Sequence, residues 1–301
     1  MGLSVRRLHP HFAADISGVY LRDVDDPTFA QIREALEEHS VLVFHDQHLS
    51  DDEQIAFTRR FGPLEETTRS IAQNTRVAPQ IADLSNVDDA GHTMSADDRR
   101  MLYHKGNQLW HSDSSFKPVP AMASLLSARE VPPEGGETEY ASLRAAWDAL
   151  PLTLQKQLDD AVAVHSFAYS RGLIAPGLLL PEQEAALPPV RHRLVRVNPV
   201  NGRKAVYLGS HASHLVGMSV DEGRALLRDL LAHATQPQFV FTHRWRVGTC
   251  VMWDNRAVMH RGRPWDTARH RRVMHRTTVA GDGPTVPEPV VAADAAERRA
   301  E

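Results

Sequence analysis

The chain has 301 residues, of which 42% are hydrophobic and 24% charged, with a formal net charge of −4. This length and composition fit a soluble globular protein with one large β-rich domain or two small ones. The small acidic excess argues against general attraction to nucleic acid or anionic membranes, and the single Cys250 excludes an intrachain disulfide. No apolar run approaches the length of a membrane span, and the N-terminus lacks a signal-peptide core. We therefore expect a cytoplasmic protein that binds neither nucleic acid nor membrane.

The first elements expected along the chain are two helices with a strand between them. An Asp-Asp-Pro sequence is typical of a helix start, and this helix should end near Ser40. The apolar stretch Val41–Phe44 predicts a buried strand. Ser50 and Glu53 form a capping box that should open a second helix ending at Gly62.

Two less regular segments are expected to be active-site loops. Residues 65–105 are long, polar and weakly periodic, apart from a strand pattern at Ile81–Val87. Residues 171–190 are rich in Leu and Pro, as in an apolar lid or a crossing loop. Long loops in compact domains often carry function, which is the reason for this expectation.

The remaining pattern alternates helices with short strands. Helices are expected over 142–150 and 152–164, and a third should run from the capping box at Ser219 to Ala234. Asn201-Gly202 predicts the turn of a hairpin. Further strands are predicted over Ala121–Ser127, Gln238–Trp245, Thr249–Trp253 and Arg272–Ala280. Without regular βαβ alternation, this order favours a mainly β protein with inserted helices, an antiparallel sandwich or jelly-roll barrel. We expect one domain over residues 1–281 and a disordered tail over 282–301.

A His-x-Asp pair and a distant His form a candidate metal site. His111 and Asp113 would point to the same side of an extended segment, and His260 follows a predicted strand and a short polar turn. In a chain with 17 His residues, about one His-x-Asp triplet is expected by chance, so the pair alone carries little information. Two imidazoles and one carboxylate are the facial triad of non-haem Fe(II) oxygenases, which leaves metal positions open.

An Arg-rich segment near the C-terminus is a candidate anion site. Arg272 and Arg276 differ by four residues, so they would share one face of a strand. The planar guanidinium fork matches a carboxylate. Two such residues would suit two acids, a co-substrate and a substrate, although a solvated basic face is the simpler alternative.

Together these patterns resemble the Fe(II)/2-oxoglutarate-dependent dioxygenases of the taurine dioxygenase family, and within it the 2,4-dichlorophenoxyacetate dioxygenase branch. The resemblance runs from about His9 to Gly281. It is carried by the motifs at Ser40–Phe44, Gln54–Phe57, Phe61–Glu65, Asn107–Phe116, Pro132–Thr138, Val251–Arg256 and His260–Gly262.

The resemblance implies a double-stranded β-helix and a role for each matching residue. His111, Asp113 and His260 match the iron ligands. The remaining matches are Thr138 and Arg272 for the distal carboxylate of 2-oxoglutarate, Arg276 for the acidic group of the substrate, and Asn107 for a substrate contact. Between Glu65 and His92, the candidate substrate residues are Arg69 and His92.

The implied activity needs Fe(II) as a cofactor and consumes 2-oxoglutarate and O2, and it hydroxylates a small organic acid while releasing succinate and CO2. For an aryloxyalkanoate, hydroxylation next to the ether oxygen would release a phenol and glyoxylate. The carboxylate of Asp113 favours hydroxylation over halogenation, because related halogenases lack it. An alkyl sulfonate or sulfate ester substrate, a zinc hydrolase, a non-redox barrel that binds a small acid, and assembly as a homo-oligomer remain open.

Overall fold

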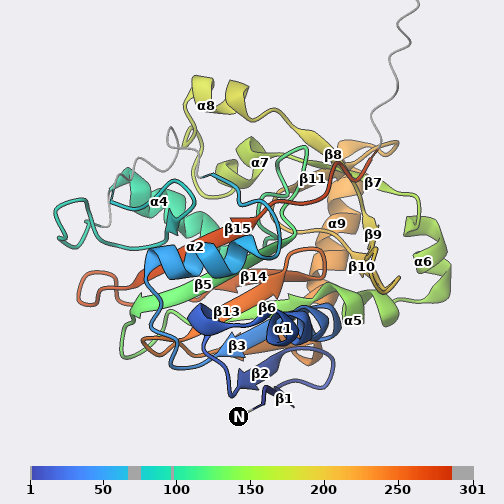
Figure 1. Ribbon diagram of the computed structural model, residues 1–301. Helices are drawn as coiled ribbons and strands as arrows, with labels where there is room; N and C mark the ends of the chain where they lie inside the picture. Colours follow the sequence, from blue (N-terminus) through green and yellow to red (C-terminus); the bar gives the residue numbers. More distant parts are fainter. Residues whose placement is uncertain (1, 67–75, 96–97, 287–301) are drawn as a thin grey trace, which may run out of the picture.

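The computed structural model describes residues 2–66, 76–95 and 98–286 (Figure 1). Its main element is a seven-stranded sheet of order β1-β2-β3-β13-β5-β15-β4, in which only the β2–β3 pair is parallel. In this spatial order the strands are Ser4–Arg7, Ala14–Ser17, Val41–Phe44, Cys250–Asp254, Ala123–Glu130, Val273–Val279 and Ala82–Asp83.

A second, three-stranded sheet packs against the first and completes the barrel. Its order is β12-β6-β14, over Val240–His243, Thr138–Ser142 and Val258–Gly262. Tyr140 and Val258 from this sheet are buried in one cluster with Val43, Leu126 and Trp253 from the large sheet. Two facing, largely antiparallel sheets with a shared apolar core confirm the predicted jelly roll.

Helices cover the outer faces of both sheets. On the large sheet, α1 (Asp26–His39) and α2 (Asp51–Arg59) bury Ile32, Leu36 and Phe57 against its strands, and α2 crosses β5 and β15 (Figure 1). On the small sheet, α5 (Leu143–Asp148) and α9 (Val220–Ala234) share a second apolar cluster with Met259 of β14. Strand β14, which carries His260, is therefore supported from outside by α5 and α9.

The other elements lie outside these two sheets. A three-stranded sheet of order β11-β7-β8 comprises Ala212–Leu215, Val162–His165 and Val190–Arg193, and a hairpin joins β9 (Val195–Val197) to β10 (Lys204–Val206). The short helices are α4 (Arg99–Lys105), α6 (Leu152–Leu158), α7 (Phe167–Gly172) and α8 (Pro181–Ala186), with 3-10 turns η1 (Leu21–Asp23), η2 (Gly106–Gln108) and η3 (Pro237–Phe239).

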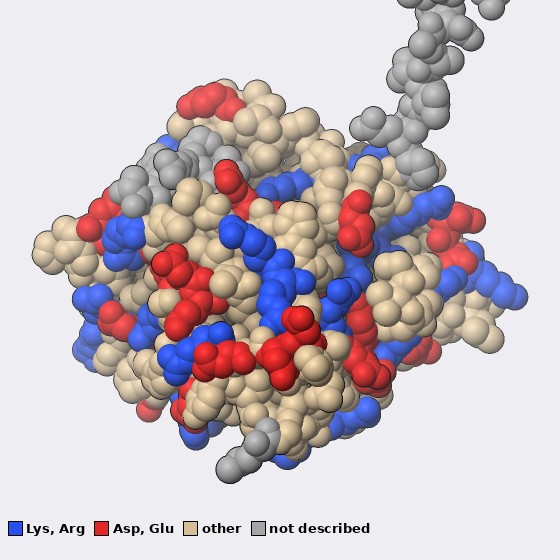
Figure 2. All heavy atoms as spheres, viewed as in Figure 1, with Lys and Arg blue, Asp and Glu red and all other residues tan. Residues whose placement is uncertain are grey.

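None of the helices in the described ranges has the length and apolar character needed to cross a bilayer. Acidic and basic side chains lie intermixed over the face drawn in Figure 2.

Local sequence signals predicted the helix starts well. The Asp25 carboxylate caps α1 by accepting a hydrogen bond from the backbone N–H of Thr28 at 2.9 Å. Both predicted capping boxes are present, at the starts of α2 and α9. The predicted hairpin is also confirmed, with β9 and β10 paired antiparallel around Gly202, which has a φ of 70°.

Several boundaries predicted from the sequence were wrong. The second helix ends at Arg59 and not at Gly62. The helix expected over 152–164 stops at Leu158, and Val162 begins a strand because this Val-rich stretch pairs with β8 and β11. Only Ala82–Asp83 of the strand expected at 81–87 is present.

The C-terminal tail predicted to be disordered begins with described residues. The Thr285 hydroxyl lies 2.8 Å from Nδ1 of His192, so residues 282–286 return to the surface of β8. Residues 287–301 lie outside the described part of the chain.

Candidate metal and co-substrate site

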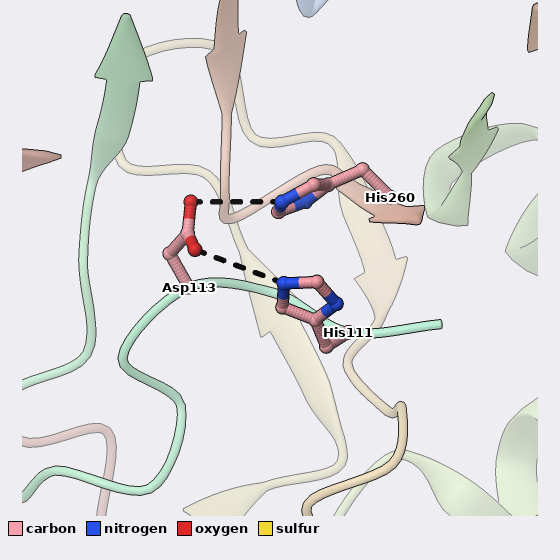
Figure 3. A group of neighbouring side chains, drawn as sticks. All are labelled: His111, Asp113 and His260. Atoms are coloured by element: carbon pink, nitrogen blue, oxygen red, sulfur yellow. Dashed lines mark ion pairs between the residues drawn. The ribbon is translucent and has the colours of Figure 1, made fainter. Parts of the chain in front are cut away.

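Three side chains converge where the two sheets of the barrel meet. His111 lies in the loop before β5 and pairs with His260 of β14 through two backbone hydrogen bonds of 3.0 and 2.8 Å. The Asp113 carboxylate faces both rings, with its oxygens 3.9 Å from Nε2 of His111 and 3.8 Å from Nε2 of His260 (Figure 3). All three residues are buried, and their ligand atoms lie within 4.8 Å of one another. Strand β14 was not predicted from the sequence, because its five residues, Val-Met-His-Arg-Gly, show no clear alternation of apolar and polar side chains.

Hydrogen bonding prepares this group for a metal ion. Nδ1 of His111 lies 2.7 Å from the carbonyl oxygen of Leu109, which can only accept a hydrogen bond. The proton of the neutral ring therefore sits on Nδ1, and Nε2 presents its lone pair toward Asp113. Nδ1 of His260 is buried and has no hydrogen-bond partner among the described atoms. The donor set fits a divalent ion that takes imidazole and carboxylate ligands.

The charge state of the group also suits a divalent cation. Burial alone would raise the pKa of Asp113, but the positive charge of Arg276, with electrostatic contributions from His260 and His111 and the hydrogen bond from Ser124, outweighs it and lowers the pKa to about 2. Burial lowers the pKa of His260 well below its ordinary value and that of His111 as well. At neutral pH the site therefore holds one carboxylate and two neutral imidazoles.

A second set of hydrogen bonds orients Asp113. The Ser124 hydroxyl donates to Oδ2 of Asp113 at 2.8 Å, and the backbone N–H of Asp113 donates to the side chain of Asn255 at 3.0 Å. Asn255 in turn donates to Ser124 and accepts from the indole of Trp253, both at 3.0 Å. Asn255 belongs to a motif that the sequence singles out, whereas no sequence pattern marks Ser124.

Two cavities meet at the triad. The first is lined by His260, Thr138, Arg272 and Trp265, and the second by Asp113, Phe116, Phe167 and Arg171. Three residues line both: Asn107, His111 and Arg276. A metal ion held by the triad would thus face both cavities, and each cavity could hold a different ligand.

The first cavity offers a cation and a hydroxyl group. Arg272 is only 7% exposed, its Nε donates to the carbonyl oxygen of Gly136 at 3.2 Å, and its guanidinium lies 5.3 Å from the centre of the Trp265 ring. Burial lowers its pKa to about 10, and no described carboxylate forms an ion pair with it. The Thr138 oxygen accepts from the indole of Trp245 at 3.0 Å, so its hydroxyl proton is free to donate. This cavity can bind the far end of a dicarboxylic acid.

The other residues predicted to bind the substrate do not all line the cavities. Arg276 faces the triad, and its guanidinium donates to Oδ1 of Asp113. Asn107 lies on η2 between the two cavities. The His92 side chain is 80% exposed beside Asp88 and lines neither cavity. Arg69 lies outside the described residues. Arg171, which the sequence pattern did not mark, lines the second cavity from helix α7.

Comparisons with known proteins agree with this geometry. The family model described as "Taurine catabolism dioxygenase TauD, TfdA family" matches residues 4–278. The chain is 45% identical to the alpha-ketoglutarate-dependent 2,4-dichlorophenoxyacetate dioxygenase of Cupriavidus pinatubonensis, over 93% of this chain and 98% of the relative. It is 37% identical to an (S)-phenoxypropionate/alpha-ketoglutarate-dioxygenase of Sphingobium herbicidovorans, with 90% and 92% covered.

A solved structure of AAD-2 in complex with Mn(II) and N-oxalylglycine superposes with a TM-score of 0.88 at 44% identity, covering 96% of this chain and all of the other. An alpha-ketoglutarate-dependent sulfate ester dioxygenase of Pseudomonas putida is more distant, at 30% identity over 94% of this chain and 91% of the relative. The family predicted from the motifs is confirmed. The chain belongs to the TauD/TfdA family of dioxygenases.

Proposed function

We propose that this chain is an Fe(II)- and 2-oxoglutarate-dependent dioxygenase that hydroxylates an aryloxyalkanoate such as 2,4-dichlorophenoxyacetate. The observation that carries the proposal is the buried His111–Asp113–His260 group at the junction of two cavities, each with an arginine in its wall. A single domain over residues 1–281 would supply this activity, since N-terminal β1 and C-terminal β15 belong to the same sheet.

In the proposed reaction, O2 and 2-oxoglutarate are consumed with the aryloxy acid. One oxygen atom enters succinate, which forms together with CO2, and the other hydroxylates the carbon between the ether oxygen and the carboxylate. The resulting hemiacetal breaks its C–O bond to give a phenol and glyoxylate. Fe(II) held by His111, Asp113 and His260 would supply the activation of O2.

The wall of the first cavity supports 2-oxoglutarate as the co-substrate. Arg272 provides a buried guanidinium that forms no ion pair with a described carboxylate, and Thr138 provides a hydroxyl proton for the distal carboxylate. N-oxalylglycine, bound in the AAD-2 structure, differs from 2-oxoglutarate by an NH group in place of one methylene. The same cavity would therefore accept both acids.

Arg272→Gln is expected to raise the Kd of 2-oxoglutarate about 30- to 150-fold, because a charge-assisted hydrogen bond contributes about 2–3 kcal/mol. The control is Arg271→Gln, which removes the neighbouring guanidinium whose partner is the exposed Glu130 at 2.8 Å. Anaerobic titration of the Fe(II)-loaded protein with 2-oxoglutarate, followed by its visible charge-transfer band, measures both. Equal affinities in the two variants would reject the role of Arg272.

The second cavity supports an aryl substrate. The rings of Phe116 and Phe167 lie 4.5 Å apart, and that of His211 lies 5.0 Å from Phe116. Stacked or tilted aromatic side chains provide an apolar wall for a flat ring. An alkyl sulfonate or sulfate ester would meet the same cations but would gain less from this wall.

Substrate-dependent succinate formation tests the proposal. The panel contains 2,4-dichlorophenoxyacetate, both phenoxypropionate enantiomers, taurine and an alkyl sulfate ester, each with Fe(II), 2-oxoglutarate and O2. We expect aryloxy acids to stimulate succinate release most and to yield equal amounts of phenol. No stimulation by any aryloxy acid would reject this substrate class, and stimulation by the sulfate ester alone would favour the alternative. No succinate with any compound would favour a non-redox acid-binding protein.

A further inference from the structure

The loop that leads into Arg272 is held by the buried side chain of Asn86. Asn86 is fully buried, and its Nδ2 donates to the carbonyl oxygens of Thr267 and His270, both at 3.0 Å. Its Oδ1 accepts from the backbone N–H of Arg272 at 2.8 Å, and its own backbone N–H donates to the Arg272 carbonyl oxygen at 3.3 Å. A side-chain amide has two N–H groups and one oxygen. Both donors and the acceptor of Asn86 are therefore used to fix this loop and the residue that follows it.

A second side chain reaches one of the same carbonyl oxygens. The indole Nε1 of Trp265 donates to the carbonyl oxygen of His270 at 3.3 Å, and the Arg272 guanidinium lies 5.3 Å from the centre of the Trp265 ring. Trp265 packs closely on Gly135, where an added Cβ would lie 3.1 Å from the Cβ of Trp265. A carbonyl oxygen has two lone pairs, so that of His270 can accept from Asn86 and from Trp265 together. We call these two side chains the His270 clamp.

The position of the Arg272 guanidinium depends on how both ends of this residue are held. Asn86 holds the backbone, while the Gly136 carbonyl oxygen accepts from Nε of Arg272 at 3.2 Å. In the described ranges, neither terminal nitrogen of Arg272 has a hydrogen-bond partner, so both are available to a ligand. Hydrogen bonds weaken steeply when their distance or angle departs from the optimum. A shift in the start of β15 would therefore weaken the contact of Arg272 with a carboxylate whose molecule is bound at its other end near the triad.

We propose that Asn86 is a positioning residue for the co-substrate. Through the His270 clamp, it holds the start of β15 at the place where Arg272 meets the distal carboxylate of 2-oxoglutarate. This inference rests on the proposed function and deepens it. Asn86 lines neither cavity, so it can act on the acid only through Arg272 and the loop before it. Because the clamp orders this loop before the acid arrives, it reduces the entropy lost on binding.

The test uses Asn86→Ala and a matched control, Asn198→Ala. Asn198 is also buried, and its Nδ2 donates to Glu37 at 2.6 Å. Its Oδ1 accepts from the backbone N–H groups of Val200 and Asn201, at 2.8 and 3.3 Å, and it lines neither cavity. Each alanine variant therefore loses the hydrogen bonds of one buried amide with both its donor and its acceptor in use. Chemical denaturation of the metal-free proteins measures the cost of each change to stability.

Two acids separate positioning from stability. The acid 2-oxopentanoate has the same 2-oxo acid end as 2-oxoglutarate, but a methyl group stands in place of the distal carboxylate. The ratio of its Kd to that of 2-oxoglutarate measures the contribution of Arg272, and this ratio does not depend on the fraction of the protein that is folded. Anaerobic titration of the Fe(II)-loaded proteins, followed by the visible charge-transfer band, gives both constants.

We expect Asn86→Ala to raise the Kd of 2-oxoglutarate about 5- to 20-fold, because a displaced guanidinium makes weaker hydrogen bonds. The preference for 2-oxoglutarate over 2-oxopentanoate should fall by the same factor, while Asn198→Ala should keep the wild-type preference. In the Arg272→Gln background, Asn86→Ala should change the Kd by less than about twofold, since two residues that act through one contact are not additive. Trp265→Phe, which keeps a ring beside Arg272 but lacks the indole N–H, should lower the preference about 2- to 5-fold.

An unchanged preference in Asn86→Ala, or an equal loss of affinity in the Arg272→Gln background, would overturn the assignment. If Asn86→Ala does not fold, Trp265→Phe decides by the same two criteria. The two proposals can fail separately. If the wild-type protein does not prefer 2-oxoglutarate over 2-oxopentanoate, the proposed co-substrate is wrong and the role of Asn86 falls with it. If the wild type has this preference and Arg272→Gln removes it while Asn86→Ala keeps it, only the Asn86 assignment is lost.

Discussion

Replacing His111 by alanine is expected to abolish the visible band that Fe(II) and 2-oxoglutarate give without oxygen, and to lower turnover about a thousandfold or more. A thousandfold corresponds to about 4 kcal/mol of activation free energy, a magnitude within reach of metal-ion catalysis. The physical reason is the loss of one of three protein ligands. His111 contributes the lone pair of Nε2, whose direction is fixed by the hydrogen bond from Nδ1 to Leu109.

A matched control separates this effect from the general loss of a histidine. His45 also lies near a carboxylate, 3.8 Å from Asp15, but its side chain is 45% exposed and lines neither cavity. His45→Ala should keep the band and the turnover of the wild type. The measurement is an anaerobic absorption titration with 2-oxoglutarate at saturating Fe(II), followed by a succinate assay in air. A normal band in the His111 variant would remove this residue from the ligand set.

The three candidate ligands, which the structure brings together, could be proposed from the sequence because each has a local sequence signal. The His-x-Asp pair needs only an extended segment, and His260 stands in a short motif after a strand. What the motifs could not supply is the mutual arrangement. The isolated bridge between His111 and His260, which sets the spacing of the two imidazoles, joins residues far apart in the chain and depends on the packing of β14 beside β6.

The division of the space beside the triad into two cavities could not be predicted from the sequence either. Arg272 and Arg276 were predicted to share a face, and both line the first cavity. The bond from Arg276 to Asp113 arises from the position of β15 relative to the loop after η2, which no local pattern encodes. Arg171 lies near the end of α7 (Phe167–Gly172), a helix that was not predicted, at the first residue of the segment that the sequence marks only as a loop rich in Leu and Pro. Its position in the wall of the second cavity is a tertiary property.

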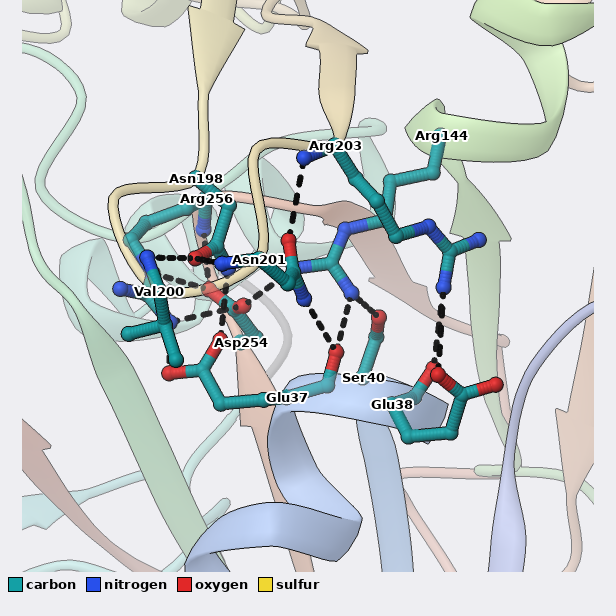
Figure 4. A network of polar contacts seen from close by, with 10 residues as sticks. All are labelled: Glu37, Glu38, Ser40, Arg144, Asn198, Val200, Asn201, Arg203, Asp254 and Arg256. Atoms are coloured by element: carbon teal, nitrogen blue, oxygen red, sulfur yellow. Dashed lines mark hydrogen bonds and ion pairs between the residues drawn. The ribbon is translucent and has the colours of Figure 1, made fainter.

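A separate buried network joins the walls of the barrel. Asp254, at the end of β13, is fully buried between two arginines (Figure 4). Nη2 of Arg144 donates to it at 3.2 Å, and Arg256 donates through Nε at 2.9 Å and Nη2 at 3.1 Å. Arg256 also donates to Glu37 of α1 at 2.8 Å. The network thus ties α1 and α5 to the turn that leads into β14 and His260.

Asp254→Asn is expected to lower the free energy of unfolding by about 3–5 kcal/mol, the typical penalty for breaking a buried ion pair on one side. The amide has nearly the volume of the carboxylate, so the change removes charge without opening a cavity. Burial by itself lowers the pKa of Arg144 and opposes the charged form of Arg256, and Asp254 acts in the opposite direction on both. Without it, two buried guanidinium groups would lose their common counter-charge.

The matched control is Asp160→Asn, since Asp160 pairs with Arg193 at 3.1 Å but its side chain is 99% exposed. Exposed pairs contribute about 0–1 kcal/mol, so this variant should unfold close to the wild type. Chemical denaturation followed by tryptophan fluorescence gives the free energy of unfolding of both variants. The slope of this free energy against denaturant concentration shows whether both expose the same surface on unfolding. Since Asp254 touches neither cavity, the folded Asp254→Asn protein should keep the 2-oxoglutarate affinity of the wild type. An unchanged free energy of unfolding in Asp254→Asn would contradict this prediction. The two arginines would then need a counter-charge other than Asp254, and the turn before β14 would depend on the bond between Arg256 and Glu37.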